Sequence, residues 1–366
     1  MPLVPRHIQD LESYKPGQNI ADIKKQFNLE RIIKLASNEN PHGPSPKALE
    51  AVEKSLENNF RYPDAAALSL REKLASQFDV KLENVTVGAG SEGIMSAIMR
   101  TFLRMGDEII AADNSFIGFR VLANASGMRV NWVPLRRFRH DLVAMTSLIN
   151  DYTKIIYLAN PDNPTGTYFT KDEFDAFMNA VPSRVLVILD EAYFEYAKHV
   201  HDYPDSMHYR YDNVITLRTF SKAHGLAGFR VGYGFAHENL ITNLLKVKLP
   251  FEPSWPAQVA AMAAIDDIDY VESTISHCRE GMEKMITTFN QMDLDMIPSV
   301  ANFITLLFDC EDEALSFNDS MLQQGVILRH LSGWGLPECI RVTIGSDEEN
   351  EYMIDCLSKT LSSYKY

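Results

Sequence analysis

Thr219-Phe-Ser-Lys-Ala-His-Gly-Leu-Ala-Gly-Phe-Arg230 is the stretch that decides the fold of this 366-residue chain. It sets Lys222 among hydroxyl-bearing and small residues, with an arginine eight positions later, just after the apolar run Val214–Leu217. A lone lysine is usually a surface residue. Here the hydroxyls of Thr219 and Ser221 and the guanidinium of Arg230 could bind a phosphate dianion, which would hold an aldehyde near the lysine amine. The stretch therefore predicts an imine-forming lysine beside a phosphate-binding group.

A second stretch, Val185–Leu189, is entirely apolar and is followed by Asp190 and Tyr193. Such a run predicts a strand buried on both faces, which would deliver an acid and a phenol to the end of a sheet. Asp190 alone could merely cap a turn, but a buried carboxylate could also pair with a protonated pyridine nitrogen. Tyr193 could then donate to the ring hydroxylate. Together with Lys222, these residues predict a site for pyridoxal phosphate.

Two loops follow other predicted strands. Asn160-Pro-Asp-Asn-Pro-Thr-Gly166 contains two prolines and a glycine, so we expect a rigid turn that could aim Asn163 at a ring oxygen. Gly88-Ala-Gly-Ser-Glu-Gly93 matches the dinucleotide pattern G-x-G-x-x-G, and Asp113 ends the next strand as that pattern requires. Its backbone amides at a helix N-terminus would suit either a dinucleotide or pyridoxal phosphate. A nicotinamide-dependent oxidoreductase is therefore an alternative, although it leaves Lys222 unexplained.

Short β-type runs alternate with helical patterns from about residue 65 to 245, which predicts an α/β fold with a largely parallel sheet between helices. The expected strands are Asn84–Val87, Glu108–Ala111, Val130–Pro134, Lys154–Leu158, Val185–Leu189, Val214–Leu217 and Arg230–Phe235. We expect an N-terminal arm that is also part of a small domain (1–34), a large cofactor-binding domain (35–250) and a small α/β domain (251–366). The small domain should contain strands at Asn302–Phe308, Val326–Arg329 and Ile340–Ile344, and helices at 311–324 and 346–363.

Composition narrows the class of protein. The net charge of −14 and the sequence pI near 5.2 argue against nucleic-acid and anionic-membrane partners, because phosphate repulsion would be uncompensated. The beginning of the chain lacks a signal-peptide pattern, and no run approaches the ~20 apolar residues needed to span a bilayer. The four cysteines show no metal-ligand spacing, and His199 and His201 lack a third ligand. We therefore expect a cytoplasmic protein without a metal site.

Arg341 lies inside an alternating β-type run, Ile340–Ile344, and Arg329 ends the preceding predicted strand. Strand arginines are usually solvated or paired to an acid. An arginine that faces an active-site cleft could instead bind a carboxylate or phosphate through two parallel hydrogen bonds.

The chain resembles the class II aminotransferases, and within them most closely the histidinol-phosphate aminotransferases. The resemblance covers nearly the whole chain, and it is specific because many short motifs occur in the family's order. These motifs are Leu35-Ala-Ser-Asn-Glu-Asn-Pro, Arg61-Tyr-Pro-Asp, Gly88-Ala-Gly-Ser-Glu, Asn160-Pro-Asp-Asn-Pro-Thr-Gly, Asp190-Glu-Ala-Tyr, Thr219-Phe-Ser-Lys with Arg230, and Ile340-Arg-Val-Thr-Ile-Gly.

The resemblance implies a pyridoxal-phosphate enzyme of fold type I, with a seven-stranded sheet, that acts as a homodimer with shared active sites. Motif by motif, it implies that Lys222 bonds to the cofactor, Asp190 contacts the pyridine nitrogen, and Tyr193 and Asn163 contact the ring oxygen. It further implies cofactor contacts for Gly90, Ser91, Phe116, Thr219, Ser221, Arg230 and, from the other subunit, Tyr62. The implied substrate contacts are Tyr14, Asn38, Asn163, Arg329 and Arg341.

Two positions depart from the family's usual pattern. Phe116 stands where tyrosine often stacks on the ring, and Asp162 replaces a commoner asparagine. Both leave the choice of substrate open. The implied reaction is amino transfer between histidinol phosphate and 2-oxoglutarate. The alternatives within the fold are an aromatic amino-acid aminotransferase and a pyridoxal-phosphate decarboxylase.

Overall fold

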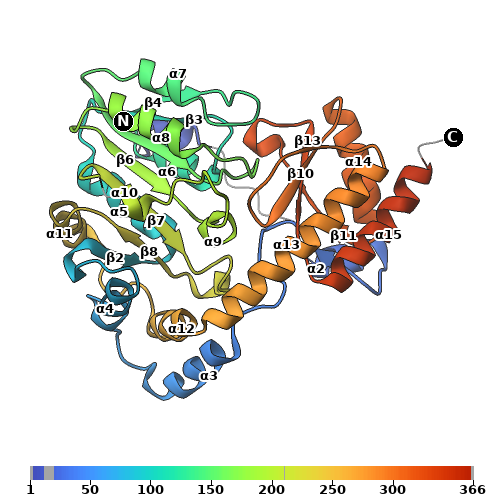
Figure 1. Ribbon diagram of the computed structural model, residues 1–366, viewed down its shortest axis with the longest axis horizontal. Coiled ribbons are helices and arrows are strands. Elements are labelled where there is room, and N and C mark those ends of the chain that lie inside the picture. The colour runs from blue at the N-terminus through green and yellow to red at the C-terminus, as the bar shows by residue number, and fades with distance from the viewer. Residues whose placement is uncertain (1–2, 12–19, 210, 364–366) are drawn as a thin grey trace.

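The computed structural model describes residues 3–11, 20–209 and 211–363. Its centre is a seven-stranded sheet with the strand order β2-β8-β7-β6-β5-β3-β4 (Figure 1). All neighbouring strands run parallel except β8, which is antiparallel to both β2 and β7. The strands are β2 (Val85–Gly88), β3 (Glu108–Ala112), β4 (Arg129–Val133), β5 (Thr153–Ala159), β6 (Leu186–Asp190), β7 (Val214–Thr219) and β8 (Gly232–Phe235).

The central strands are buried on both faces, which explains their unbroken apolar sequences. In β6, Leu186 and Ile188 face a core cluster formed with α5 (Gly90–Phe102), α6 (Ile117–Ala125) and α11 (Glu238–Val247). Val187 and Leu189 face a second cluster, formed with α7 (Leu142–Ser147) and α8 (Lys171–Ala180). Helices therefore cover both faces of the sheet, as predicted.

A second sheet has four antiparallel strands in the order β12-β13-β10-β9. Its strands are β9 (Asp295–Ile297), β10 (Phe303–Leu307), β12 (Arg329–His330) and β13 (Cys339–Thr343). The helices that pack on it are α13 (Ile268–Gln291), α14 (Glu311–Gln323) and α15 (Asp347–Ser363). Ile33 and Leu35 are buried in the same core, and the short β1 (Ile33–Lys34) pairs with β11 (Val326–Ile327).

The two sheets are linked by α13, which runs from the large sheet to the small one in Figure 1. Near its start, Val271 and Ile275 pack on Ala223, whereas Met285 and Phe289 near its end lie in the core of the small sheet. Its neighbour α12 (Trp255–Asp266) packs instead against α3 (Pro46–Ser55) and α4 (Leu68–Gln77) in a core shared with β2 and β8. The division into domains at residues 34 and 250 remains a prediction.

The remaining described elements are short. They are α1 (Arg6–Gln9), α2 (Ile20–Phe27), α9 (Phe194–Ala197), α10 (Ser206–Tyr209) and the 3-10 turns η1 (Leu56–Asn58), η2 (Leu82–Asn84), η3 (Ala227–Phe229) and η4 (Ser332–Trp334).

The α/β fold and all seven strands of the large sheet are confirmed, with ends that differ from the prediction by at most two residues. The sequence did not predict β1 or β9, which are only two and three residues long. The single strand predicted at Val326–Arg329 is wrong, because β11 and β12 are separate strands that belong to different sheets. None of the described helices has the length and apolar character needed to cross a membrane.

Candidate active site

A cavity of about 240 Å³ opens at the carboxyl ends of β5, β6 and β7, where the last strand residues Ala159, Asp190 and Thr219 line it. This is the edge of a parallel sheet where ligands are expected. The cavity brings together nine of the predicted site residues, which are Ser91, Phe116, Asn163, Asp190, Tyr193, Thr219, Ser221, Lys222 and Arg230.

Lys222 lies just beyond the end of β7, with its ammonium group inside the cavity. The Nζ atom donates a hydrogen bond of 3.2 Å to the carbonyl of Ser37 and lies 5.7 Å from the centre of the Tyr193 ring. Burial, followed by the positive charges of Arg341 and Arg230, lowers the pKa of Lys222 to about 8, although Glu39 opposes the shift. A substantial fraction of the amine is therefore neutral near pH 8 and can act as a nucleophile or base.

Asp190 ends β6 at the floor of the cavity and is almost fully buried. Its Oδ2 atom accepts a hydrogen bond of 2.8 Å from the hydroxyl of Tyr157, whereas Oδ1 is buried without a hydrogen-bond partner in the described structure. Burial raises the pKa of Asp190 to about 7 against the lowering effect of the Tyr157 hydrogen bond. One carboxylate oxygen is thus fixed and the other is left without a protein donor.

A network of side chains joins the cavity wall to the small sheet. Tyr193 accepts a hydrogen bond of 2.8 Å from the amide of Asn38, and burial raises the pKa of its phenol to about 12. The side-chain oxygen of Asn38 in turn accepts a bond of 3.0 Å from Thr343. The guanidinium of Arg341 donates to the side-chain oxygen of Asn163 and, at 2.9 Å, to the carbonyl of Ala36. Asn38, Asn163 and Arg341 thus belong to the same constellation as Tyr193.

The opposite end of the cavity contains the predicted phosphate-binding groups. Thr219 donates a hydrogen bond of 3.0 Å to Ser221, and Arg230 donates one of 3.4 Å to the same hydroxyl. Arg230 also forms an ion pair of 3.2 Å with Glu92. Gly90, the first residue of α5, has a φ of +73°, and a Cβ atom there would lie 2.7 Å from the Arg230 guanidinium. The absence of a side chain at Gly90 therefore lets the arginine approach the helix N-terminus.

These features fit pyridoxal phosphate. The free Asp190 Oδ1 matches a protonated ring nitrogen, and the α5 N-terminus with Arg230 and two hydroxyls matches a phosphate dianion. A Cβ at Gly232 would lie 2.5 Å from the Ser91 amide nitrogen, so the chain keeps that amide clear for an anion. The partly neutral amine of Lys222 lines the same cavity.

Two further predicted residues, Tyr62 and Arg329, do not line the cavity, and a third lies outside the described part of the chain. Tyr62 is 81% exposed and stacks on Phe251 with a ring separation of 4.3 Å, outside the residues that line the cavity. Arg329 pairs in register with Arg341 on the neighbouring strand, and its guanidinium lies 5.2 Å from the Trp334 ring centre. Tyr14 lies outside the described residues.

The dinucleotide alternative loses its structural context. That fingerprint requires a parallel strand-helix-strand unit, but β2 lies at the edge of the sheet and pairs only with the antiparallel β8. Asp113, the acid that should bind a ribose, forms an ion pair of 2.9 Å with Arg120. Gly88, Gly90 and Gly93 therefore form the start of α5 beside Arg230.

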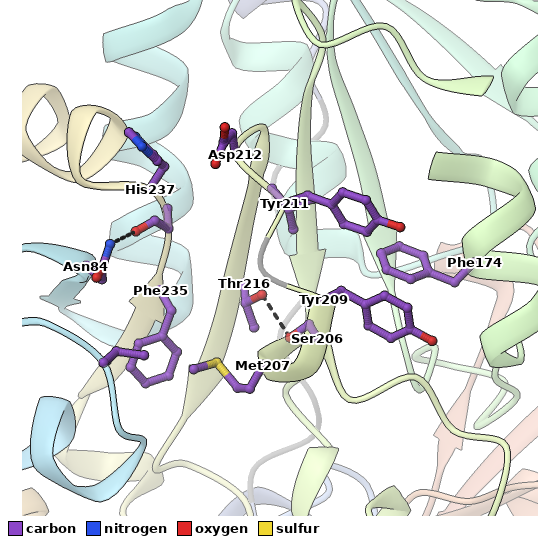
Figure 2. A pocket seen from close by; sticks show the side chains of 13 residues that line it. Asn84, Phe174, Ser206, Met207, Tyr209, Tyr211, Asp212, Thr216, Phe235 and His237 are labelled. Atoms are coloured by element: carbon purple, nitrogen blue, oxygen red, sulfur yellow. Dashed lines mark hydrogen bonds between the residues drawn. The ribbon is translucent and has the colours of Figure 1, made fainter. Parts of the chain in front are cut away.

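Figure 2 shows a different cavity, of about 130 Å³, lined by Tyr209, Tyr211 and Phe174 on one side and Asn84 and His237 on the other. It lies by the beginning of β7, so it is separate from the Lys222 cavity. Two of its hydroxyls pair with each other, because Thr216 donates a hydrogen bond of 2.9 Å to Ser206. Among the described residues, its lining includes one carboxylate, Asp212, but no lysine or arginine of the kind that converge with Asp190 in the other cavity.

The sequence did not single out Tyr157 or Glu92. Tyr157 lies within the apolar run of β5, where a tyrosine is indistinguishable from a packing residue. Asp162 also had no assigned contact; it is fully buried and accepts hydrogen bonds from Ser115 at 2.5 Å and Thr165 at 3.0 Å. These bonds hold the loop that carries Asn163.

Comparisons with known proteins agree with this site. Histidinol-phosphate aminotransferase 2 of Hydrogenovibrio crunogenus is 41% identical over 363 residues, which cover 98% of this chain and 96% of that protein. The histidinol-phosphate aminotransferase of Brevibacillus brevis is 42% identical over 351 residues, covering 95% and 96%. The chain is therefore similar over its length to curated histidinol-phosphate aminotransferases.

Solved structures extend the likeness. The crystal structure of histidinol-phosphate aminotransferase from Sinorhizobium meliloti in complex with pyridoxal-5'-phosphate has a TM-score of 0.91 at 26% identity, covering 100% of this chain and 99% of that one. A mutant Thermus thermophilus aspartate aminotransferase has a TM-score of 0.84 at 19% identity, covering 98% and 100%, and shows the fold alone. A family model described as aminotransferase class I and II matches residues 30–357. The chain belongs to the aminotransferase class I and II family.

Proposed function

We propose that this chain is a pyridoxal-phosphate-dependent aminotransferase that transfers an amino group between histidinol phosphate and 2-oxoglutarate. The observation that carries the proposal is the convergence of Lys222, Asp190 and Arg230 in one cavity at the carboxyl edge of the sheet. The names of the relatives at 41% and 42% identity support histidinol phosphate as the amino donor.

When bound, pyridoxal phosphate supplies an aldehyde and an electron-withdrawing ring. Arg230, Ser221, Thr219 and the amides of Gly90 and Ser91 would bind its phosphate at the N-terminus of α5. Asp190 Oδ1 would accept a hydrogen bond from the protonated ring nitrogen, and Phe116 would pack on the ring. Tyr193 and Asn163 would orient the ring oxygen.

Lys222 has two tasks in this proposal. Its neutral amine would be the group that holds the cofactor aldehyde, and once the substrate amine had displaced it, Nζ would be the base placed to take the proton from the substrate α-carbon. The lowered pKa of Lys222, about 8, suits both tasks, because a protonated amine can neither attack a carbonyl nor accept a proton. Arg341 lies beside Asn163, where its guanidinium can bind an anionic group of the substrate.

The preference for histidinol phosphate should depend on the polar groups that bind the phosphate of the substrate. A site with polar groups placed for a substrate group discriminates by about 10⁴ to 10⁵ against its absence, whereas an apolar pocket separates similar side chains by only about 10 to 200. We expect kcat/KM for histidinol phosphate to exceed that for histidinol by about 10³ or more. The proposed donors to the substrate anion are Arg341, Arg329 and Tyr14. Asn38, which hydrogen-bonds to Tyr193 and Thr343, is a further proposed substrate contact.

A panel of amino donors with 2-oxoglutarate tests the proposal. Glutamate formation with histidinol phosphate as the best donor supports it. Equal rates with phenylalanine or tyrosine would replace it by aromatic amino-acid transamination. Release of carbon dioxide without glutamate would indicate a decarboxylase.

We further propose a cytoplasmic homodimer with shared active sites. Three aromatic side chains, Phe60, Tyr62 and Phe251, are 76%, 81% and 41% exposed. Tyr62 and Phe251 stack on each other, so they form an apolar surface that a second copy could cover. The four cysteines are free thiols, which suits a reducing compartment. Light scattering of wild type and Tyr62→Ala tests the dimer.

A further inference from the structure

We propose that Tyr157 is a positioning residue for Asp190: its hydroxyl holds one carboxylate oxygen so that the other faces the ring nitrogen of the bound cofactor. The inference rests on the proposed function and deepens it, because it assigns a side chain that orients Asp190 and favours its ionised form. Tyr157 itself does not line the cavity.

The register of the sheet brings the two residues together. In the parallel pair of β5 and β6, Ala159 lies opposite Asp190 and Tyr157 lies opposite Ile188. Residues two positions apart on a strand point to the same face, so the side chain of Tyr157 lies on the same face of the sheet as those of Ala159 and Asp190. The tyrosine side chain is long enough to span these two residues, and its hydroxyl donates to Asp190 Oδ2 at 2.8 Å.

The ring of Tyr157 is held in place by an aromatic neighbour. Phe119 stacks on it with a centroid separation of 3.8 Å and an angle of 8° between the planes. Both side chains are buried, and Phe119 belongs to α6, the helix that begins directly after Phe116. Helix α6 therefore supplies Phe119, which holds the Tyr157 ring, and it begins directly after Phe116, which is proposed to pack on the cofactor.

The hydrogen bond also has an electrostatic effect. A donor to a carboxylate favours its charged form, and here it opposes burial and the nearby carboxylates Glu92 and Glu191, which raise the pKa of Asp190. Burial, with Asp190, Asp162 and Tyr193 nearby, raises the pKa of Tyr157 well above its ordinary value, so its hydroxyl remains a donor. Without that donor, a proton shared between the ring nitrogen and Asp190 would shift toward the carboxylate.

Tyr157→Phe is the matched test, because it removes one oxygen atom and preserves the stacked ring. Tyr168→Phe is the control, since Tyr168 also donates a 2.8 Å hydrogen bond to a carboxylate, that of Asp202, away from the cavity. Each purified variant is loaded with pyridoxal phosphate labelled with nitrogen-15 in the ring. The nitrogen-15 resonance reports directly whether the ring nitrogen carries a proton.

For Tyr157→Phe we expect the resonance to move toward the position of an unprotonated pyridine, and the dissociation constant of the cofactor to rise about tenfold. Tyr168→Phe should match the wild type in both measurements. A second variant, Phe119→Leu, keeps the hydroxyl but removes the stacked ring, so we expect a smaller shift in the same direction.

A Tyr157→Phe resonance at the wild-type position would overturn the inference while leaving the proposed function intact. Failure of the wild type to bind pyridoxal phosphate would overturn the proposed function and the inference with it. The two results are distinguishable, because the wild-type spectrum is recorded first.

Discussion

Arg341 on β13 donates a hydrogen bond through its guanidinium to the side-chain oxygen of Asn163, a residue of the loop after β5. The other guanidinium nitrogen binds the carbonyl of Ala36 at 2.9 Å. One arginine of the small sheet is therefore tied both to the wall of the cofactor cavity and to the N-terminal segment. This position makes it the side chain best placed to connect the binding of an anionic substrate to the large sheet.

Arg341→Lys should reduce the preference for a phosphorylated substrate, because an ammonium cannot reproduce two parallel hydrogen bonds. We expect kcat/KM for histidinol phosphate to fall by about 10 to 100-fold, and that for histidinol by much less. Steady-state kinetics with both donors measure the change. Arg329→Lys, on the neighbouring strand, tests the second proposed donor in the same way. An equal loss for both substrates in Arg341→Lys would assign that arginine a structural role only.

Lys222→Ala should fold and bind the cofactor phosphate but lose covalent attachment and nearly all turnover, since no other amine lies in the cavity lining. Mass spectrometry after borohydride reduction of the wild-type protein should find the pyridoxyl group on Lys222. A label on another lysine would contradict the assignment.

The rate of cofactor attachment should follow the protonation of Lys222, whose pKa is lowered to about 8. Below that pH the amine is mostly protonated, so the rate should rise about tenfold per pH unit and level off above pH 8. Stopped-flow absorbance of the cofactor-free enzyme mixed with pyridoxal phosphate measures this profile.

Two variants should move the profile in opposite directions. Arg341→Gln removes a positive charge that lowers the pKa of Lys222, so the plateau should begin at higher pH. Glu39→Gln removes a negative charge that raises the same pKa, so the plateau should begin at lower pH. Shifts of the same sign in both variants would show that these charges do not set the pKa.

Gly90→Ala should weaken cofactor binding, because its Cβ would lie 2.7 Å from the Arg230 guanidinium. Gly43→Ala is a matched control: its φ of +71° nearly equals the +73° of Gly90, but no atom lies within 4 Å of the added Cβ. Backbone strain of about 1 to 3 kcal/mol should lower the free energy of unfolding of both variants. Calorimetry should find weakened pyridoxal phosphate binding in Gly90→Ala alone, and normal binding there would remove Gly90 from the phosphate site.

The sequence predicted the large sheet well, because its strands are fully apolar and alternate with helices. It also predicted nine of the residues that line the cavity, among them Asp190, Thr219 and Asn163, which stand directly at or after strand ends. A residue that directly follows a predicted strand can be assigned to the end of that strand from the sequence alone. The edge of a parallel sheet then brings them together.

What the sequence could not predict are contacts between distant segments. Tyr157 has the apolar neighbours of a core residue, and only the pairing of β5 with β6 places its hydroxyl on Asp190. The packing of α12 on α3 was also hidden, because α12 has apolar residues around most of its circumference. Tyr62 is exposed in the single chain, so its predicted contact with the cofactor requires a second copy.

The burial of Ile33 and Leu35 beside Met353 and Leu357 has a consequence for how the molecule forms. The core of the small sheet contains residues from both ends of the sequence, with the whole large sheet between them. Contacts so far apart along the chain are slow to form. During synthesis the early segment must wait, unpaired and partly apolar, until α15 has left the ribosome, so the small sheet should be the last part of this protein to acquire its native core.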